Sequence, residues 1–229
     1  NYRREEQMMD NNKLLIFDLD GTLIDTIEDL SDSLNRLLEK HGLPSHTQEE
    51  YKIFVGDGIK ETLIRSLPVN NRDEETVESL LSEFKTEYSN NYLNKSNLYP
   101  GIADLIKKLS DMELTLCVLS NKSHDFTVRL IDNFFDTSVF AKILGLSDRF
   151  PAKPETDALE YLLRIFDISP ENAIMIGDTR TDIQTGKNAG IATVGVTWGF
   201  RDRKELENYE ADFIIDQPQQ LLNIVNKIG

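Results

Sequence analysis

The stretch Lys13-Leu14-Leu15-Ile16-Phe17-Asp18-Leu19-Asp20-Gly21-Thr22 decides the fold, because a short apolar run stops there at two acids and a glycine. Four of the five residues before Asp18 are apolar, which predicts a buried strand. Residues i and i+2 of an extended segment point the same way, so the Asp18 and Asp20 carboxylates are expected to face one site. Gly21 then permits a turn that a residue with a Cβ would resist.

The two neighbouring acids favour a metal site over an ordinary acidic turn. Carboxylates pressed together repel each other unless something offsets their charge, and a hard cation with oxygen ligands does so. A lone Asp-x-Asp is commonly just an exposed turn, but these acids directly follow an apolar strand. We therefore expect Asp18 and Asp20 to lie at the end of a buried strand.

Further apolar runs predict more strands, and helical patterns separate them. The runs cover residues 114–119, 173–176 and 191–196, with a weaker one at 213–215. Apolar residues at helical spacing lie in the segments 102–109, 128–135, 159–166 and 221–225. Strands that alternate with helices predict an α/β fold with a Rossmann-like parallel sheet, covered on both faces. Ligands bind such sheets at the carboxyl ends of the strands.

One region breaks this alternation. Between about residues 27 and 93 the apolar residues repeat only at helical spacing, and Leu43-Pro44 and Leu67-Pro68 punctuate the pattern. This predicts a small helical bundle inserted after the first strand. We expect a tail at 1–12, a core domain formed by 13–24 and 96–229, and a helical domain at 25–95.

Composition and charge exclude several classes of protein. The chain has 229 residues and a net charge of −15, which argues against a nucleic-acid partner and against an anionic membrane surface. The single cysteine, Cys117, rules out an internal disulfide and a multi-cysteine zinc cluster. No signal peptide or membrane-spanning window is visible, so we expect a cytoplasmic protein.

Polar residues also follow the other predicted strands. Ser120-Asn121-Lys122 ends the second run, and its side chains and backbone amides suit phosphate oxygens, although a helix cap would use the same residues. Lys153-Pro154 precedes the helix predicted at 159–166, and Pro154 is expected in the first turn of that helix. Asp178 ends the run 173–176, and Asp182 lies one helical turn beyond it. N-capping of the following helix is the simpler role for these two acids, but a metal site would explain why both lie at the end of a predicted strand.

In this order the four segments resemble the signature of the haloacid dehalogenase superfamily, specifically its phosphoglycolate-phosphatase-like members with a helical cap. The segments are Asp18-x-Asp20-Gly21-Thr22, Ser120-Asn121-Lys122, Lys153-Pro154 and Gly177-Asp178-x-x-x-Asp182. The similarity extends from about Lys13 to the C-terminus. A dehalogenase proper is less similar, because its first motif lacks the acid that Asp20 supplies.

The resemblance implies a Mg²⁺-dependent phosphatase acting on a small phosphorylated metabolite. Asp18 would attack phosphorus, and Asp20 would protonate the leaving alcohol and then deprotonate water. Ser120, with Thr22 and Asn121 nearby, would bind the phosphoryl group, while Lys153 would neutralise its charge. The metal ligands would be Asp18, the Asp20 carbonyl, Asp178 and Asp182, although Asp182 could instead orient Lys153.

The resemblance also assigns the helical insert to a cap that closes over the site. Its hinge would begin at Asp25 and Thr26 and return over about residues 92–99. Within the cap, Val55-Gly56-Asp57-Gly58-Ile59-Lys60 matches the substrate-specificity loop of the family. Gly56, Asp57, Gly58 and Lys60 are therefore candidate substrate contacts, and an ordinary helix–helix turn is the equally weighted alternative.

Several alternatives stay open at the level of sequence. A phosphosugar mutase, a nucleotidase or a pyrophosphatase could use the same four motifs, and a non-catalytic relative would keep the fold without turnover. The identity of the phosphorylated substrate and the oligomeric state are not specified by these motifs.

Overall fold

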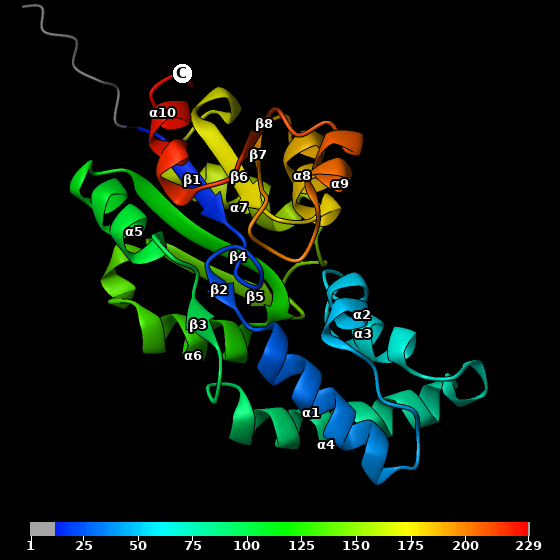
Figure 1. Ribbon diagram of the computed structural model, residues 1–229. Helices are drawn as coiled ribbons and strands as arrows, with labels where there is room; N and C mark the ends of the chain where they lie inside the picture. Colours follow the sequence, from blue (N-terminus) through cyan, green and yellow to red (C-terminus); the bar gives the residue numbers. More distant parts are fainter. Residues whose placement is uncertain (1–11, 229) are drawn as a thin grey trace, which may run out of the picture.

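A computed structural model describes residues 12–228 and has a six-stranded parallel sheet at its centre (Figure 1). The predicted tail at 1–12 lies outside the described residues except for Asn12. The sheet order is β5-β4-β1-β6-β7-β8, so the strand that ends at Asp18 lies in the middle. The strands are β1 (Leu14–Phe17), β4 (Thr115–Ser123), β5 (Lys142–Leu146), β6 (Ala173–Gly177), β7 (Ala192–Val196) and β8 (Phe213–Ile215).

The alternating side chains of β1 build a hydrophobic core on each face of the sheet. Leu15 and Phe17 pack in one cluster with residues of α5 (Ile102–Asp111), α6 (His124–Phe134) and α10 (Leu221–Val225). Leu14 and Ile16 pack in a second cluster with residues of α7 (Asp157–Phe166). All four β1 side chains are at most 1% exposed. Because both faces are covered, β1 is a continuous apolar run rather than an alternating one.

Two further helices of the core pack against the strands β6, β7 and β8. α8 (Arg180–Asn188) contacts β6 and β7, and α9 (Arg203–Asn208) contacts β7 and β8. Four short 3-10 helices join the larger elements: η1 (Val69–Asn71), η2 (Thr137–Val139), η3 (Pro170–Asn172) and η4 (Pro218–Gln220).

Residues 27–91 form a separate layer of helices, here called the cap. It contains α1 (Ile27–Lys40), α2 (Gln48–Phe54), α3 (Ile59–Ser66) and α4 (Glu74–Asn91). These helices share their own cluster of buried residues, which reaches the core at Phe126 and Phe200. Figure 1 shows the cap beyond the carboxyl end of β1, so the cap covers the edge of the sheet where ligands are expected.

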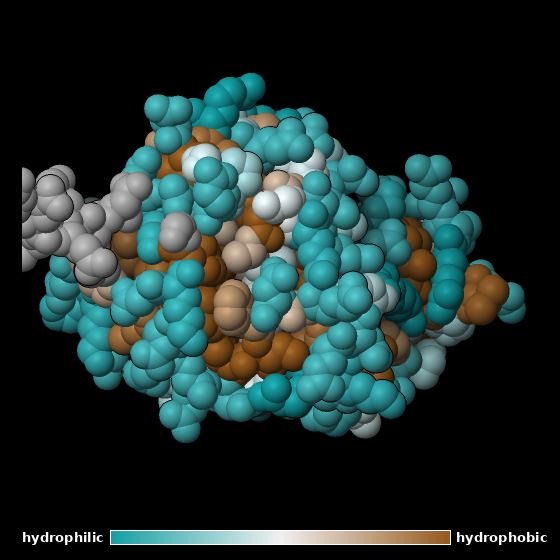
Figure 2. All heavy atoms as spheres, turned by 90° about the horizontal axis from the view of Figure 1, so that it is seen from above, coloured by the Kyte–Doolittle hydropathy of each residue, from teal (hydrophilic) through white to brown (hydrophobic). Residues whose placement is uncertain are grey.

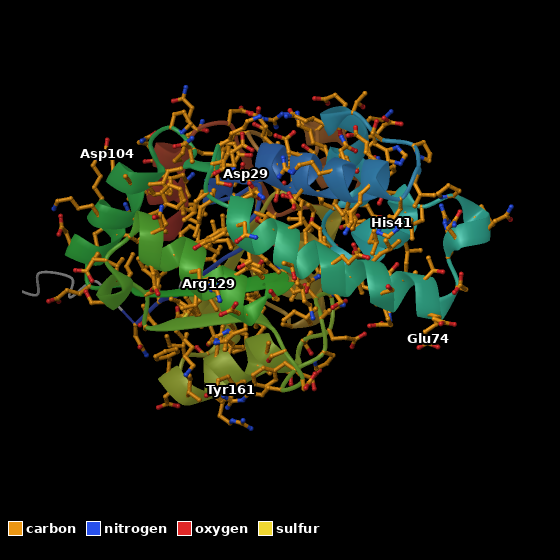
Figure 3. The ribbon with its side chains drawn as sticks, turned by 90° about the horizontal axis from the view of Figure 1, so that it is seen from below. Asp29, His41, Glu74, Asp104, Arg129 and Tyr161 are labelled. Atoms are coloured by element: carbon orange, nitrogen blue, oxygen red, sulfur yellow. The ribbon has the colours of Figure 1, made fainter. Side chains whose placement is uncertain are left out.

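Two crossing segments connect the cap to the core, and they pair with each other. β2 (Ile24–Asp25) and β3 (Asn97–Leu98) form a two-stranded antiparallel ribbon. Asp29, at the start of α1, is 2% exposed and binds the returning segment. Its carboxylate accepts hydrogen bonds from the Lys95 and Ser96 backbone amides and from Ser96 Oγ, at 2.7–3.1 Å. Figure 3 shows Asp29 near one end of α1, which lies beside α4.

The structure confirms most of the predicted elements and corrects two. The alternating sheet and the helical insert are present, as are the helices expected from the four periodic segments. Edge strand β5 was missed because most of its residues are only half buried and give no long apolar run. The placement of Pro154 in a first helical turn was wrong, because α7 begins at Asp157.

The surface agrees with the charge balance of the sequence. The face in Figure 2 is mostly hydrophilic, with hydrophobic residues gathered in patches between the polar ones. Within residues 12–228, no helix has the length and apolar character that crossing a membrane would require.

Asp29 offers a test of how the cap is held to the core. Asp29→Ala should destabilise the protein by at least about 2 kcal/mol, because it removes bonds to a charged acceptor and leaves buried amides unpaired. Urea unfolding measures this change. Asp32→Ala is the control: Asp32 pairs only with the partly exposed Lys95 ammonium, so a loss within about 0.5 kcal/mol is expected. Equal losses in both variants would contradict the assignment.

Candidate active site

A buried lysine joins three segments of the chain at the carboxyl edge of the sheet. Lys153 Nζ lies 2.9 Å from Asp18 Oδ1 and 2.6 Å from Asp182 Oδ1, and it donates to the Leu119 carbonyl at 2.9 Å. The lysine is 5% exposed. Burial works against the Lys153 charge, but the Asp18 and Asp182 carboxylates outweigh it and raise its pKa. Lys153 is therefore a fixed cation beside Asp18.

Asp182 is held by the start of its own helix. Its Oδ2 accepts hydrogen bonds from the Thr179 amide at 3.0 Å and from Thr179 Oγ1 at 2.9 Å. With Oδ1 on Lys153, both carboxylate oxygens have partners. Of the two roles considered for Asp182, this geometry favours orienting Lys153.

Asp178 follows β6 and is fully buried. Its Oδ2 accepts from the Phe200 amide at 2.7 Å, and its Oδ1 accepts from Thr22 Oγ1 at 3.3 Å. Gly21 has φ +85°, and a Cβ there would lie 2.3 Å from Asp178 Oδ2. Only glycine therefore lets the turn after β1 come so close to Asp178. Thr22, expected to bind substrate, instead supports Asp178.

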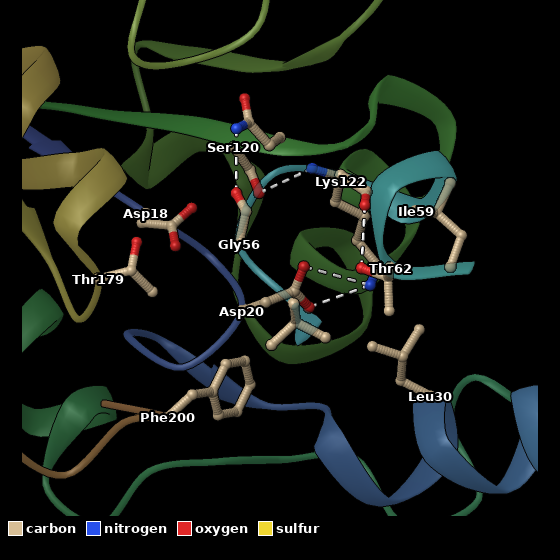
Figure 4. A pocket seen from close by; sticks show the side chains of 13 residues that line it. Asp18, Asp20, Leu30, Gly56, Ile59, Thr62, Ser120, Lys122, Thr179 and Phe200 are labelled. Atoms are coloured by element: carbon tan, nitrogen blue, oxygen red, sulfur yellow. Dashed lines mark hydrogen bonds and ion pairs between the residues drawn. The ribbon is translucent and has the colours of Figure 1, made fainter. Parts of the chain in front are cut away.

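Asp20 points to the opposite side of the site from the Lys153 cluster. Its Oδ1 accepts from Thr26 Oγ1 at 2.5 Å and from Lys122 Nζ at 3.0 Å, and Lys122 Nζ lies 3.3 Å from Oδ2. Figure 4 shows Lys122 and Asp20 joined near Thr62 and Leu30, with Asp18 farther away. The Asp20 side chain is thus held outside the group of acids formed by Asp18, Asp178 and Asp182.

These three acids have the chemistry of a divalent cation site. One oxygen from each of Asp18, Asp178 and Asp182 lies within 4.8 Å of the others. Burial raises the pKa of Asp18 to about 7, with Lys153 opposing and Asp182 adding to the shift. Burial, Asp182 and Asp18 also raise the pKa of Asp178. One lysine does not balance three buried carboxylates, so a hard cation fits here.

Side chains at the carboxyl end of β4 line the same site. Ser120 Oγ accepts from the Lys122 amide at 3.2 Å. Asn121 Nδ2 donates to the Lys153 and Gly56 carbonyls at 3.0 Å, and Asn121 Oδ1 accepts from the Lys153 amide at 2.8 Å. Asn121, expected to bind substrate, therefore positions Lys153 and joins the core to the cap.

A cavity of about 60 Å³ lies between the cap and the core. The core supplies Asp18, Asp20, Ser120, Asn121, Lys122, Thr179 and Phe200, and the cap supplies Leu30, Val55, Gly56, Gly58, Ile59 and Thr62 (Figure 4). The acids and Ser120 meet apolar cap side chains across this space. Gly56 and Gly58, two of the predicted cap contacts, line the cavity.

The other two cap candidates do not line this cavity. Lys60 points to Glu78, which its Nζ meets at 2.6 Å on the surface. Asp57 reaches the core: its carboxylate accepts from Arg180 Nη2 at 2.9 Å and from Thr181 Oγ1 at 3.1 Å, and it also pairs with Arg65. Burial opposes the Asp57 charge, but Arg65 and Arg180 hold its pKa below the usual value. Asp57 therefore latches the cap loop to α8.

Sequence analysis missed three contributors to the site. Lys122 belongs to the Ser120-Asn121-Lys122 motif, but the sequence assigns it no role, and only its contact with Asp20 indicates one. Arg201 Nη2 donates to the Ile53 and Val55 carbonyls at 3.0 and 2.8 Å, which adds a second latch. Phe200 lines the cavity. Arg201 and Phe200 follow β7, far from any motif, and no sequence pattern marks them.

Comparison with known proteins agrees with this geometry. The family model of the haloacid dehalogenase-like hydrolases matches residues 15–196. A phosphoglycolate phosphatase of Vibrio vulnificus is 32% identical over 219 residues, covering 93% of this chain and 96% of that protein. A phosphoglycolate phosphatase of Vibrio cholerae is 30% identical over 223 residues, covering 95% of this chain and 98% of that protein.

Solved structures with the same fold include relatives from other bacteria. A predicted phosphoglycolate phosphatase from Haemophilus somnus superimposes with a TM-score of 0.87 at 27% identity, covering 94% of this chain and 99% of that one. A predicted phosphatase from Clostridium acetobutylicum has a TM-score of 0.82 at 28% identity, covering 94% and 98%.

The raised pKa of Asp18 predicts how metal binding depends on pH. An acid whose pKa rises from 3.8 to about 7 on folding binds a proton in the folded state between those values, so the metal-free protein loses stability as pH rises through this window. A cation competes with that proton. Mg²⁺ should therefore raise the melting temperature over that in EDTA more at pH 8 than at pH 5.5.

Differential scanning fluorimetry measures these shifts, with Asp18→Asn as the control. The variant lacks the titrating carboxyl, so its Mg²⁺-induced shift should be smaller and less dependent on pH. A wild-type shift that is equal at both pH values would contradict the cation site.

The Asp57 latch predicts local protection of the cap loop. Asp57→Ala removes hydrogen bonds to a charged acceptor, each worth about 1.5–3 kcal/mol, so amide exchange across residues 55–59 should accelerate at least about tenfold. Hydrogen exchange with mass spectrometry measures it. Lys60→Ala breaks the neighbouring exposed pair with Glu78 and should leave this exchange unchanged. If the two variants behave alike, Asp57 is not a latch.

Proposed function

The chain belongs to the haloacid dehalogenase-like hydrolase family and is a phosphatase, and we propose that it hydrolyses a small phosphate monoester through an aspartyl-phosphate on Asp18. The observation that carries this proposal is the separation of the two acids after β1. Asp18 lies against Lys153 and the acidic cluster, whereas Asp20 lies across the cavity with Lys122 and Thr26. This separation supports attack by Asp18 and proton transfer by Asp20.

In the proposed first step, an Asp18 oxygen attacks phosphorus. An ionised carboxylate is a nucleophile without a base to activate it, but it must approach an anionic phosphoryl group. Lys153, fixed 2.9 Å from Asp18, supplies positive charge that makes this approach possible. As the bond to Asp18 forms, the bond from phosphorus to the alcohol oxygen breaks.

Asp20 is the proposed acid and base. It gives its proton to the departing alcohol oxygen, then takes a proton from the water that attacks the aspartyl-phosphate. Breakage of the bond between phosphorus and Asp18 releases inorganic phosphate and restores both carboxyl groups to their starting states. The bonds from Thr26 and Lys122 hold Asp20 on the side of the leaving group.

Mg²⁺ is the proposed cofactor, held by Asp18, Asp178 and the Asp20 carbonyl, with Asp182 keeping Lys153 in place. When bound, it would neutralise charge on the phosphoryl oxygens. Ser120 is the proposed phosphoryl-binding hydroxyl, because it lines the cavity beside Asp18. Gly56 and Gly58 let the cap loop approach the substrate.

We propose a phosphoglycolate-like substrate. The relatives named above include phosphoglycolate phosphatases, and a cavity of about 60 Å³ suits a leaving group of a few heavy atoms. No observation specifically favours a sugar mutase, a nucleotidase or a pyrophosphatase. A cytoplasmic location stays a prediction from the sequence.

Two variants test the division of labour between the acids. Asp18→Asn should abolish phosphate release from 2-phosphoglycolate in the presence of Mg²⁺, because it removes the nucleophile. Asp20→Asn should keep substrate binding and lower kcat by about 10²–10⁴-fold. Its loss should be smaller with p-nitrophenyl phosphate, whose leaving group departs without a proton. Phosphate release and p-nitrophenol absorbance measure these rates.

Asp216→Asn is the control, since Asp216 is an exposed acid that pairs with Arg203, and its rate should match that of the wild type. Turnover by Asp18→Asn within tenfold of the wild-type rate would exclude the covalent route. An equal loss of kcat/KM, which reports the steps up to release of the alcohol, on both substrates in Asp20→Asn would exclude its role as the acid.

A further inference from the structure

Lys122 is a buried cation for which the proposed reaction has no use beyond holding Asp20. Its side chain is 8% exposed, and it lines the cavity on the side of Asp20 rather than beside Asp18. Burial works against its charge, but the Asp20 carboxylate outweighs this and raises its pKa. Lys122 is therefore an ammonium ion at the place where the alcohol part of a substrate would lie.

The hydrogen bonds of Lys122 are incomplete. An ammonium group has three N–H donors, and the acceptors that its Nζ meets within the described chain are the two Asp20 oxygens, at 3.0 and 3.3 Å. The Tyr88 ring lies below it, with 4.9 Å from Nζ to the ring centroid. At least one donor is thus available to a ligand.

A buried hydroxyl beside Lys122 also lacks a partner. Tyr88 is 1% exposed, and its hydroxyl has no hydrogen-bond partner among residues 12–228. Burial raises the Tyr88 pKa, with Lys122 opposing the shift, so the hydroxyl stays protonated and can donate. Tyr88 is not among the residues that line the cavity, so its hydroxyl would act on a ligand through the neighbouring Lys122 ammonium.

The cap side chains around Lys122 make this place selective. Leu30, Ile59 and Thr62 line the cavity together with Lys122 (Figure 4). Apolar walls exclude water, which strengthens attraction between a buried cation and an anion. A neutral leaving group would leave the ammonium without its third partner, whereas an anionic one would supply it.

We propose that Lys122 is the residue that selects the leaving group, by binding a carboxylate on the alcohol part of the substrate. This inference rests on the proposed function and adds the residue that would recognise the carboxylate of a phosphoglycolate-like substrate. A second phosphate could supply the same anionic oxygens, but a single free ammonium donor matches the less charged carboxylate better.

Matched substrates test the proposal. We would measure kcat/KM for 2-phosphoglycolate, for ethyl phosphate, which lacks the carboxylate, and for pyrophosphate, whose leaving group is a phosphate. The wild type should prefer 2-phosphoglycolate over both others by at least about tenfold, the value of one hydrogen bond to a charged group. Lys122→Met should reduce the preference over ethyl phosphate to within about threefold.

The ratio of kcat/KM for 2-phosphoglycolate to that for ethyl phosphate separates substrate selection from other roles of Lys122. Any effect of Lys122→Met on Asp20 slows both monoesters and cancels in the ratio. Tyr88→Phe keeps the ring under the ammonium and should reduce the preference severalfold. Lys60→Met is the matched control, because Lys60 is an exposed cap lysine on Glu78, and it should keep the wild-type ratio.

A measurement on the wild type remains if Lys122→Met does not fold. Glycolate should inhibit ethyl phosphate hydrolysis at least about tenfold more strongly than glycolamide, its neutral counterpart. Equal inhibition, an unchanged ratio in Lys122→Met, or a preference for pyrophosphate would each overturn the role of Lys122. Failure of the wild type to hydrolyse any of the three substrates would instead overturn the proposed function.

Discussion

The ion pair network of Lys153 is the constraint on which the site depends. Lys153 comes from the loop before α7, Asp18 from the end of β1 and Asp182 from α8, and the three meet within hydrogen-bond distance. Burying charges is costly unless each has its partners. The network is therefore stable only when these loops take up their native positions together, and this couples the packing of the sheet to the geometry of the chemistry.

The cap adds a second constraint, because the cavity exists only where the cap meets the core. Asn121 joins the Gly56 carbonyl to the loop of Lys153, and Asp57 joins the same cap loop to α8. Asn121, which holds the loop of Lys153, therefore also holds the cap. Closing the cap would remove water and complete the surroundings of Asp20 in one movement.

The two sides of the cavity have different chemistry, and the structure of β1 explains why. The Asp18 carboxylate contacts Lys153 and lies in the acidic cluster. The Asp20 carboxylate, just before the turn at Gly21, contacts Thr26 and Lys122 instead. Burial alone would favour neutral acids. A lysine on each side compensates for this cost, so two acids two residues apart have different surroundings.

The sequence by itself determined the parallel sheet, the helical insert and the order of the motif acids, because apolar periodicity and strand-end acids are local features of the chain. It did not determine where side chains from separate segments point. Only the tertiary structure shows that Asp57, Asn121 and Thr22, expected as substrate contacts, bind other parts of the chain, and it brings Lys122 to Asp20. Local patterns set which elements form, whereas contacts between distant loops depend on packing that no short segment encodes.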